Sequence, residues 1–156
     1  MRTMRSMRFP ILAVGLVAVL LGLSGCSDFD REWNAVATMK PADQTDITGR
    51  WEGTWSSDAD GHSGGLRCII TRLDPRSYHA RYAATYGGIF HFSYEMTLIA
   101  DKQTDWVQFE GSADLGSMAG GTYNYEGHAN SETFYATYKS SEDHGRFNMK
   151  RPESSK

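Results

Sequence analysis

The sequence Gly49-Arg50-Trp51-Glu52-Gly53-Thr54-Trp55 alternates between two kinds of side chain. Successive side chains of a β-strand point to opposite faces, so the glycines and tryptophans share one face and the polar residues share the other. A period of two with one apolar face is typical of a strand that is buried on one side. We therefore expect residues 49–55 to begin a β-sheet domain.

Seven further runs with the same period follow, and turn residues separate them. The residues on their apolar faces are Leu66, Cys68 and Ile70; Tyr78, Ala80, Tyr82, Ala84 and Tyr86; Phe90, Phe92, Tyr94, Met96 and Leu98; Val107, Phe109 and Gly111; Tyr123 and Tyr125; Phe134, Ala136 and Tyr138; Phe147 and Met149. This pattern predicts antiparallel strands. Such strands close most simply into an up-and-down barrel, which removes exposed edges, and a two-sheet sandwich is the alternative. We predict an all-β, eight-stranded antiparallel barrel over residues 49–151, with a polar tail at residues 152–156.

The hairpin around residues 87–89 allows its register to be predicted. Paired residues must share a face, so Tyr86 should pair with Phe90 across a three-residue loop that begins with two glycines. The same register places Arg81 opposite Glu95 on the outer face, where a pair of opposite charges contributes ~0.2–1 kcal/mol.

The N-terminal segment has the features of an export signal. Arg2, Arg5 and Arg8 precede an uncharged run, residues 9–25, that ends in small residues, as in a secretory signal peptide. Its apolar part is shorter than the ~20 residues that a membrane span needs.

Leu23-Ser24-Gly25-Cys26 resembles the lipobox of bacterial lipoproteins. In that family the signal is cut before the cysteine, which carries a thioether-linked diacylglycerol and usually an N-acyl chain. The resemblance implies that residues 1–25 are removed, that Cys26 is lipidated and that the protein is held at the cell envelope. Ser27 favours the outer membrane over the inner membrane. An ordinary cleaved signal with a chance cysteine is the alternative.

Residues 26–48 would then tether the barrel to the lipid. Phe29, Trp33 and Val36 recur at helical spacing, and Pro41 ends the pattern. The spacing predicts a short helix whose aromatic face packs against the barrel floor, although a flexible tether fits a run of this length too. Residues 41–48 have the polar composition of a linker.

Charge and cysteine content narrow the set of partners. The whole sequence has a net charge of −3. Without residues 1–25 the net charge would be about −6. Nucleic acids and anionic lipid headgroups require a basic face, so we expect neither as a partner. If Cys26 is lipidated, Cys68 has no disulfide partner, and its position on an apolar face predicts a core residue.

Gly49-x-Trp51 resembles the start of the first strand in lipocalins and the wider calycin group, which includes avidins and fatty-acid-binding proteins. In lipocalins this tryptophan closes the barrel floor, and a basic residue at the end of the last strand packs over it. Arg151 follows Phe147 and Met149 in alternation, so it would emerge inward at the same end as Trp51. The resemblance implies a barrel floor made by Trp51 and Arg151, and it implies no particular ligand.

The predicted interior is rich in tyrosine. Of eight tyrosines, seven fall on inward faces by alternation, and only Tyr135 falls outside. A buried phenol hydroxyl needs a hydrogen-bond partner. Either the hydroxyls bond one another, the backbone and internal water in a filled barrel, or they line a cavity for a ligand with flat and polar parts.

The direction of the strands places the loops at residues 56–65, 87–89, 112–119 and 139–144 at the end opposite the tether. The inward residues nearest that end, which we predict to bind a small apolar or aromatic molecule, are Trp55, Leu66, Tyr86, Phe90, Tyr123 and Tyr138. If the barrel is filled instead, we expect it to work through protein contact, as an inhibitor or assembly factor of the envelope. The outward Trp106 and Tyr135 are candidates for that contact.

We expect no enzyme activity, no catalytic residue, no metal and no cofactor. The glutamates of the strands, Glu52, Glu95, Glu110 and Glu126, point outward, so no carboxylate pair faces the interior for acid–base chemistry. Histidines and aspartates do meet at the open end: His62, His144, Asp58, Asp60, Asp114 and Asp143. Their spacing does not match a calcium loop, so solvated loop residues are the preferred interpretation.

Overall fold

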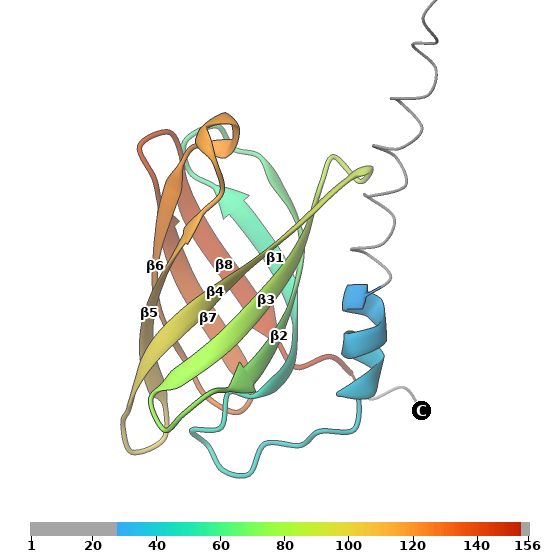
Figure 1. The fold of residues 1–156 in the computed structure, drawn as a ribbon, viewed down its shortest axis with the longest axis vertical. Coiled ribbons are helices and arrows are strands. Elements are labelled where there is room, and N and C mark those ends of the chain that lie inside the picture. The colour runs from blue at the N-terminus through green and yellow to red at the C-terminus, as the bar shows by residue number, and fades with distance from the viewer. Residues whose placement is uncertain (1–27, 154–156) are drawn as a thin grey trace, which may run out of the picture.

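The chain forms a closed β-barrel with a short helix against its outer wall (Figure 1). The computed structural model describes residues 28–153, so the predicted signal peptide and Cys26 lie outside the described residues. The strands are β1 (Gly49–Ser57), β2 (Ser63–Arg72), β3 (Ser77–Tyr86), β4 (Phe90–Lys102), β5 (Val107–Asp114), β6 (Thr122–Ala129), β7 (Thr133–Lys139) and β8 (His144–Lys150), with a 3-10 helix, η1 (Ser117–Ala119), between β5 and β6. Each strand is antiparallel to the next, and β8 returns to pair with β1. The predicted all-β, eight-stranded up-and-down barrel is confirmed.

The two-residue period of the sequence determines which side chains fill the barrel. In β3, alternate residues from Tyr78 to Ala84 are buried and the residues between them are half-buried. The predicted hairpin register is also confirmed, because Tyr86 pairs with Phe90 and Arg81 pairs with Glu95. The Nε atom of Arg81 lies 3.1 Å from a carboxylate oxygen of Glu95.

Trp51 and Arg151 lie together at the floor of the barrel. Trp51 is fully buried, and its Nε1 donates a hydrogen bond of 2.9 Å to the carbonyl oxygen of Ile47. The guanidinium carbon of Arg151 lies 3.9 Å from the centre of the Trp51 ring. The guanidinium also donates to the backbone carbonyl oxygens of Asp46, Thr48, Arg50 and Ser131. Burial lowers the pKa of Arg151 to about 10, so the side chain is still charged at neutral pH.

Residues 41–48 form part of this floor, which corrects the prediction that they are a polar linker. Ile47 is fully buried and belongs to the barrel core. The carboxylate of Asp46 is buried beside it and accepts hydrogen bonds from the N–H groups of Ala42 (2.8 Å) and Thr48 (3.0 Å). Burial alone would raise the pKa of Asp46, but these hydrogen bonds outweigh it and lower the pKa. A single isoleucine in a polar segment therefore helps to plug the barrel.

The predicted helix forms over residues 28–35, but it packs against the outer wall and not against the barrel floor (Figure 1). Phe29 and Trp33 are buried against Ile69 of β2. Ile69 points outward, and covering an apolar side chain on the outer wall removes it from water. An ion pair of 2.7 Å between Glu32 and Arg81 adds a polar contact. No helix of the described residues is long and apolar enough to cross a membrane.

β4 is longer than β5, with 13 residues against 8, and one side of the upper barrel is consequently open. β4 pairs with β5 only from Leu98 to Lys102. Within the described part of the chain, the upper residues of β4, 90–97, pair with β3 alone. The β3–β4 hairpin therefore leans away from β5 and β6 (Figure 1).

Candidate functional site

The lower half of the barrel is filled by aromatic side chains. The rings of Phe109 and Phe134 stack with their centres 4.6 Å apart, and Trp51 lies 5.6 Å from Phe134. Tyr78 is fully buried at this end. Its hydroxyl is the one buried side-chain polar atom in residues 28–153 that has no hydrogen-bond partner.

The upper half of the barrel contains a cavity of about 470 Å³. Four of the residues predicted to bind a ligand line it, namely Trp55, Leu66, Tyr123 and Tyr138. Other aromatic side chains complete the wall: Phe92, Tyr94, Tyr125 and Phe147. The rings form a continuous set, because Tyr138 lies 5.9 Å from Tyr123 and 5.2 Å from Phe147. The cavity is therefore an aromatic chamber at the end opposite the floor.

A close approach of three strands fixes the position of Trp55. The Nε1 of Trp55 donates a hydrogen bond of 2.9 Å to the carbonyl oxygen of Thr85, and Gly64 lies between them. A Cβ atom at Gly64 would come within 1.7 Å of that oxygen and within 2.7 Å of Nε1. Only glycine allows this approach, which holds the indole at the cavity wall.

Tyr86 and Phe90, which were also predicted to bind a ligand, do not line the cavity. The hydroxyl of Tyr86 lies 3.2 Å from Nε2 of His62 at the rim. Phe90 is 62% exposed. The reason is the seam between β4 and β5, where residues 90–97 of β4 have no partner on β5. Because β5 does not cover these residues, a side chain that points inward there does not enter the core.

Asp143 is the main polar group at the cavity mouth. Its carboxylate accepts hydrogen bonds from Ser57 Oγ (2.6 Å) and from the Tyr138 hydroxyl (3.3 Å). Burial, and then the nearby charge of Asp143, raise the pKa of Tyr138 above the ordinary value of a tyrosine. Asp114 also lines the mouth. A ligand in this cavity would meet an apolar wall and, at one end, carboxylate oxygens that accept hydrogen bonds.

The tyrosines deeper in the cavity are neutral. Burial raises the pKa of Tyr94 well above its ordinary value and that of Tyr125 to about 12. The ring of Tyr94 stacks on Tyr82, with centres 5.0 Å apart. Neutral phenols can donate and accept hydrogen bonds, whereas a phenolate base or nucleophile would need a lowered pKa. The chemistry of the wall suits binding.

Four loop or strand-end residues of the lining were not among the predicted ligand-binding residues: Asp114, Leu115, Ala119 and Asp143. Alternation within strands does not say how a loop folds over a barrel mouth. For Asp143 a local signal did exist. Its backbone N–H donates a hydrogen bond of 3.0 Å to Ser140 Oγ, and this serine turn aims the Asp143 carboxylate back at the barrel.

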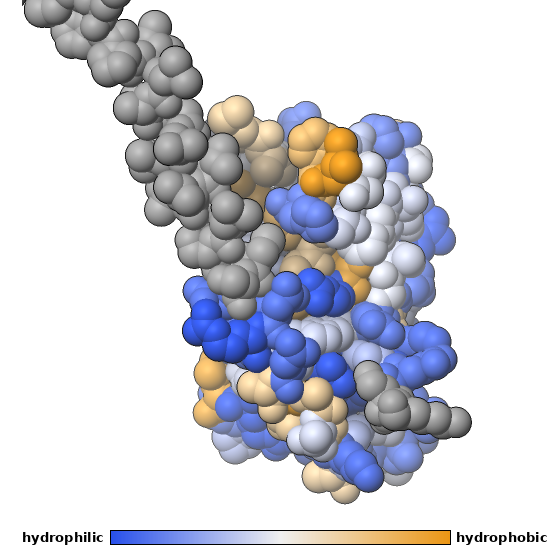
Figure 2. Space-filling view, turned by 90° about the vertical axis from the view of Figure 1, so that its right-hand side faces the viewer, coloured by the Kyte–Doolittle hydropathy of each residue, from blue (hydrophilic) through white to orange (hydrophobic). Residues whose placement is uncertain are grey.

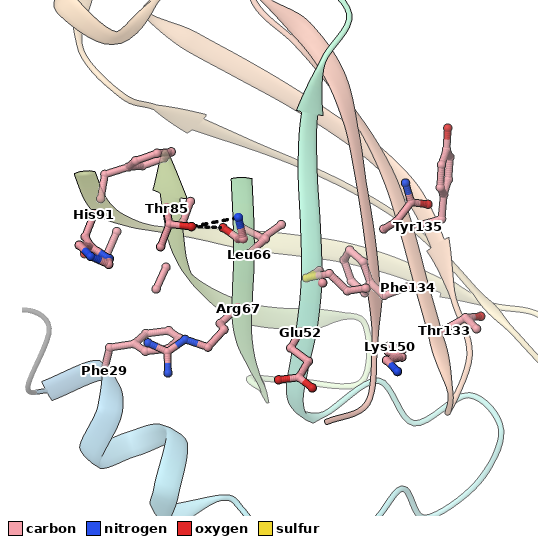
Figure 3. Close-up of a pocket in the computed structure, with 18 residues that line it drawn as sticks. Phe29, Glu52, Leu66, Arg67, Thr85, His91, Thr133, Phe134, Tyr135 and Lys150 are labelled. Carbon is pink, nitrogen blue, oxygen red and sulfur yellow. Dashed lines mark hydrogen bonds between the residues drawn. The ribbon is translucent and has the colours of Figure 1, made fainter. Parts of the chain in front are cut away.

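A larger hollow of about 970 Å³ runs over the outer wall (Figure 3). Its charged or titratable lining residues are Glu52, Arg67, His91, Tyr135 and Lys150. Figure 3 shows them spread along the wall on different strands, with Phe29 of the helix at one end. Small-molecule sites usually combine an apolar wall with a few convergent polar groups. The inner cavity fits that description better than the outer hollow.

The remaining polar residues of the open end bond to one another. Nδ1 of His62 lies 2.8 Å from Asp60, and Arg146 pairs with Asp58. Within residues 28–153 no group of three or more His, Cys, Asp or Glu side chains is placed to hold a metal ion. Cys68 is fully buried, and burial raises the pKa of its thiol, so the reactive thiolate is disfavoured.

No protein-family model, no curated protein and no solved structure matches this chain.

Proposed function

We propose that this protein is an envelope-anchored lipoprotein whose barrel binds a small molecule with an apolar or aromatic body. The cavity of about 470 Å³ in the upper barrel carries the proposal, because it lies within the usual size range of small-molecule sites, roughly 300–1,000 Å³. The lipobox at residues 23–26 supports the anchor. The envelope location rests on that motif alone.

The polar groups at the mouth narrow the ligand class. Asp143 accepts hydrogen bonds from Ser57 and Tyr138, and a carboxylate has room for about four. We propose that the ligand presents a hydrogen-bond donor, such as a hydroxyl or an amine, towards Asp143, while its flat or aliphatic part lies against Trp55 and Phe147.

The alternative is a barrel that works through protein contact. One observation favours it: Trp106 is 38% exposed on the outer side of the floor end and contacts His128 edge-on, with ring centres 6.2 Å apart. An exposed tryptophan is a common anchor at protein interfaces. This alternative predicts that loss of Trp106, and not loss of the cavity, abolishes function.

The test is binding of fluorescent apolar probes to residues 27–156, expressed without the signal segment, together with native mass spectrometry of the same protein. Ala84 lines the cavity, so Ala84→Phe should fill part of it and weaken probe binding by at least about tenfold, the effect of losing ~1.4 kcal/mol. Thr97→Phe adds an aromatic ring to the outer face of the neighbouring strand and is the matched control.

Tyr138→Phe separates the two parts of the site. It keeps the ring and removes only the hydroxyl, which lies 3.2 Å from the carbonyl oxygen of Ser56 and 3.3 Å from a carboxylate oxygen of Asp143. Ligands with a hydrogen-bond donor should change affinity in this variant, and purely apolar probes should not. Equal probe binding by wild type, Ala84→Phe and Thr97→Phe would refute the cavity as the binding site.

A further inference from the structure

The tip of the β3–β4 hairpin presents a group of exposed apolar side chains. Ile89, Phe90 and Phe92 are 74%, 62% and 45% exposed. Single exposed apolar residues are ordinary, but three within four positions of one hairpin form a patch, and such patches mark contact sites. Figure 2 views the molecule from the side of the hairpin and the helix, and it shows strongly hydrophobic side chains at the upper end of this face.

The same hairpin has no formal charge over a long stretch. No Lys, Arg, Asp or Glu occurs between Arg81 and Glu95, and these two residues pair with each other. Charged headgroups are therefore not needed for a contact at the tip, and no Lys, Arg, Asp or Glu side chain has to be removed from water when the tip is buried. His91 is the one basic side chain of this stretch, and it falls on the outer face of β4 by alternation. The hairpin tip therefore suits the interface of a bilayer, where an apolar interior meets a polar headgroup layer.

The start of the described chain lies on the same side as the hairpin. Phe29 belongs to a cluster that includes Ala83 of β3, and the helix begins at its end nearer to the hairpin (Figure 1). Ala83 is five strand residues below Gly88, which is about 17 Å at 3.3 Å per residue. Cys26 precedes Phe29 by three residues, a span of at most about 11 Å. A lipid on Cys26 would therefore hold a bilayer within reach of the hairpin tip.

An aromatic row connects the tip with the cavity. The ring of Phe92 stacks on Tyr94 at 6.4 Å, and Tyr94 stacks on Tyr125 at 6.2 Å. Phe92 and Tyr94 also form one edge of the seam at which β4 has no partner on β5. A contact at the tip would thus bring the open side of the cavity close to whatever the tip touches.

We propose that the β3–β4 hairpin is a membrane-contact site that inserts Ile89 and Phe90 into the interface of the bilayer holding the lipid anchor. This inference rests on the lipid anchor of the proposed function. It adds a second attachment, which orients the barrel so that the seam between β4 and β5 faces the lipid. The partner is a bilayer surface without a required headgroup charge, and a lipid-soluble ligand could then enter the cavity sideways.

The test uses the full lipidated chain in phosphatidylcholine vesicles, with an environment-sensitive fluorophore on Ile89→Cys. Cys68 is buried and the Cys26 thiol is blocked by lipid if the anchor is present, so the new thiol is labelled selectively. Ser141→Cys, in the exposed β7–β8 loop at the same end of the barrel, is the control. Spin-labelled acyl chains in the vesicles should quench the label at position 89 at least about threefold more than the label at position 141.

Flotation of the vesicles is measured on the labelled samples and on the unlabelled protein, and it separates the lipid anchor from the hairpin contact. If the protein floats but the label at position 89 is quenched no more than the label at position 141, the hairpin contact is refuted and the anchor stands. The tip would then be water-exposed or reserved for a protein partner. If the unlabelled protein does not float, the anchor is refuted and this inference with it.

Discussion

Replacement of Arg151 by alanine should strongly destabilise the barrel at its floor. The side chain donates four hydrogen bonds to backbone carbonyl oxygens, at 2.6 to 3.3 Å, and its guanidinium lies 3.9 Å from the centre of the Trp51 ring. A hydrogen bond from a charged group contributes roughly 1.5–3 kcal/mol, and a desolvated cation–π contact contributes about 2 kcal/mol.

These contributions are not additive, because one side chain makes all of them and water can enter when it is removed. We therefore expect Arg151→Ala to lower the free energy of unfolding by about 3 kcal/mol, the size of effect seen when a buried hydrogen-bond network is broken. For a domain of this size that corresponds to a melting temperature lower by roughly 12 °C. Arg151→Lys keeps the charge over Trp51 but has a single nitrogen, so it should recover about half of the loss.

The assay is urea unfolding of residues 27–156, followed by tryptophan fluorescence and by circular dichroism. Lys150→Ala is the matched control, because Lys150 is exposed and its ion pair with Glu153 measures 4.0 Å; it should change the free energy of unfolding by less than about 0.5 kcal/mol. The reasoning is refuted if Arg151→Ala lowers the free energy of unfolding by less than about 1 kcal/mol, or if Arg151→Lys has full stability. Either result would show that the hydrogen bonds of the guanidinium do not hold the floor together.

Three further predictions concern the tyrosines, Asp46 and the helix. Burial raises the pKa of five tyrosines, Tyr78, Tyr82, Tyr94, Tyr125 and Tyr138. When folding raises the pKa of an acid, the folded state loses stability as the pH rises above the unfolded pKa, which is about 10 for tyrosine. Ultraviolet titration should therefore show that these phenols ionise only when the protein unfolds. Gradual ionisation of all eight tyrosines near pH 10 in the folded protein would contradict this. The lowered pKa of Asp46 contributes stability above pH 4 that is lost as the pH falls through its folded pKa, so Asp46→Asn should be less stable at pH 7 and should show a shallower loss below pH 4, measured by denaturant midpoints. Phe29→Ala should loosen residues 28–35, with faster amide exchange there and unchanged exchange in β5–β8, because Phe29 packs on the outer wall only; a global rise in exchange would show that the helix supports the whole barrel.

The strands and their facing could be predicted from the sequence because both depend on local alternation. Trp51 and Arg151 meet at the floor for the same reason, because each continues the inward-facing alternation of its own strand. Alternation alone does not show which inward-facing residues are buried. Phe90 faces inward by alternation, yet it is exposed, because β4 is five residues longer than β5 and its upper end is not covered by β5.

The positions of the helix and of residues 41–48 depend on contacts between distant segments. The run Cys68-Ile69-Ile70 breaks the alternation with an apolar outward residue, and this is the signal that something covers the outer wall. Ile47 is the corresponding signal in the floor segment. Asp143 reaches the cavity mouth through a turn, and strand periodicity contains no information about that turn.

The floor also has a consequence for the order in which the barrel folds. Arg151 donates to the carbonyl oxygen of Thr48 across a separation of 103 positions, and the ring of strands closes only when β8 pairs with β1. The hairpins can form from neighbouring residues, whereas this closure joins segments from both ends of the domain and loses loop entropy before it gains contacts. We expect closure at the floor to be the slow step of folding, on a millisecond-to-second scale, and opening of the same joint to begin unfolding.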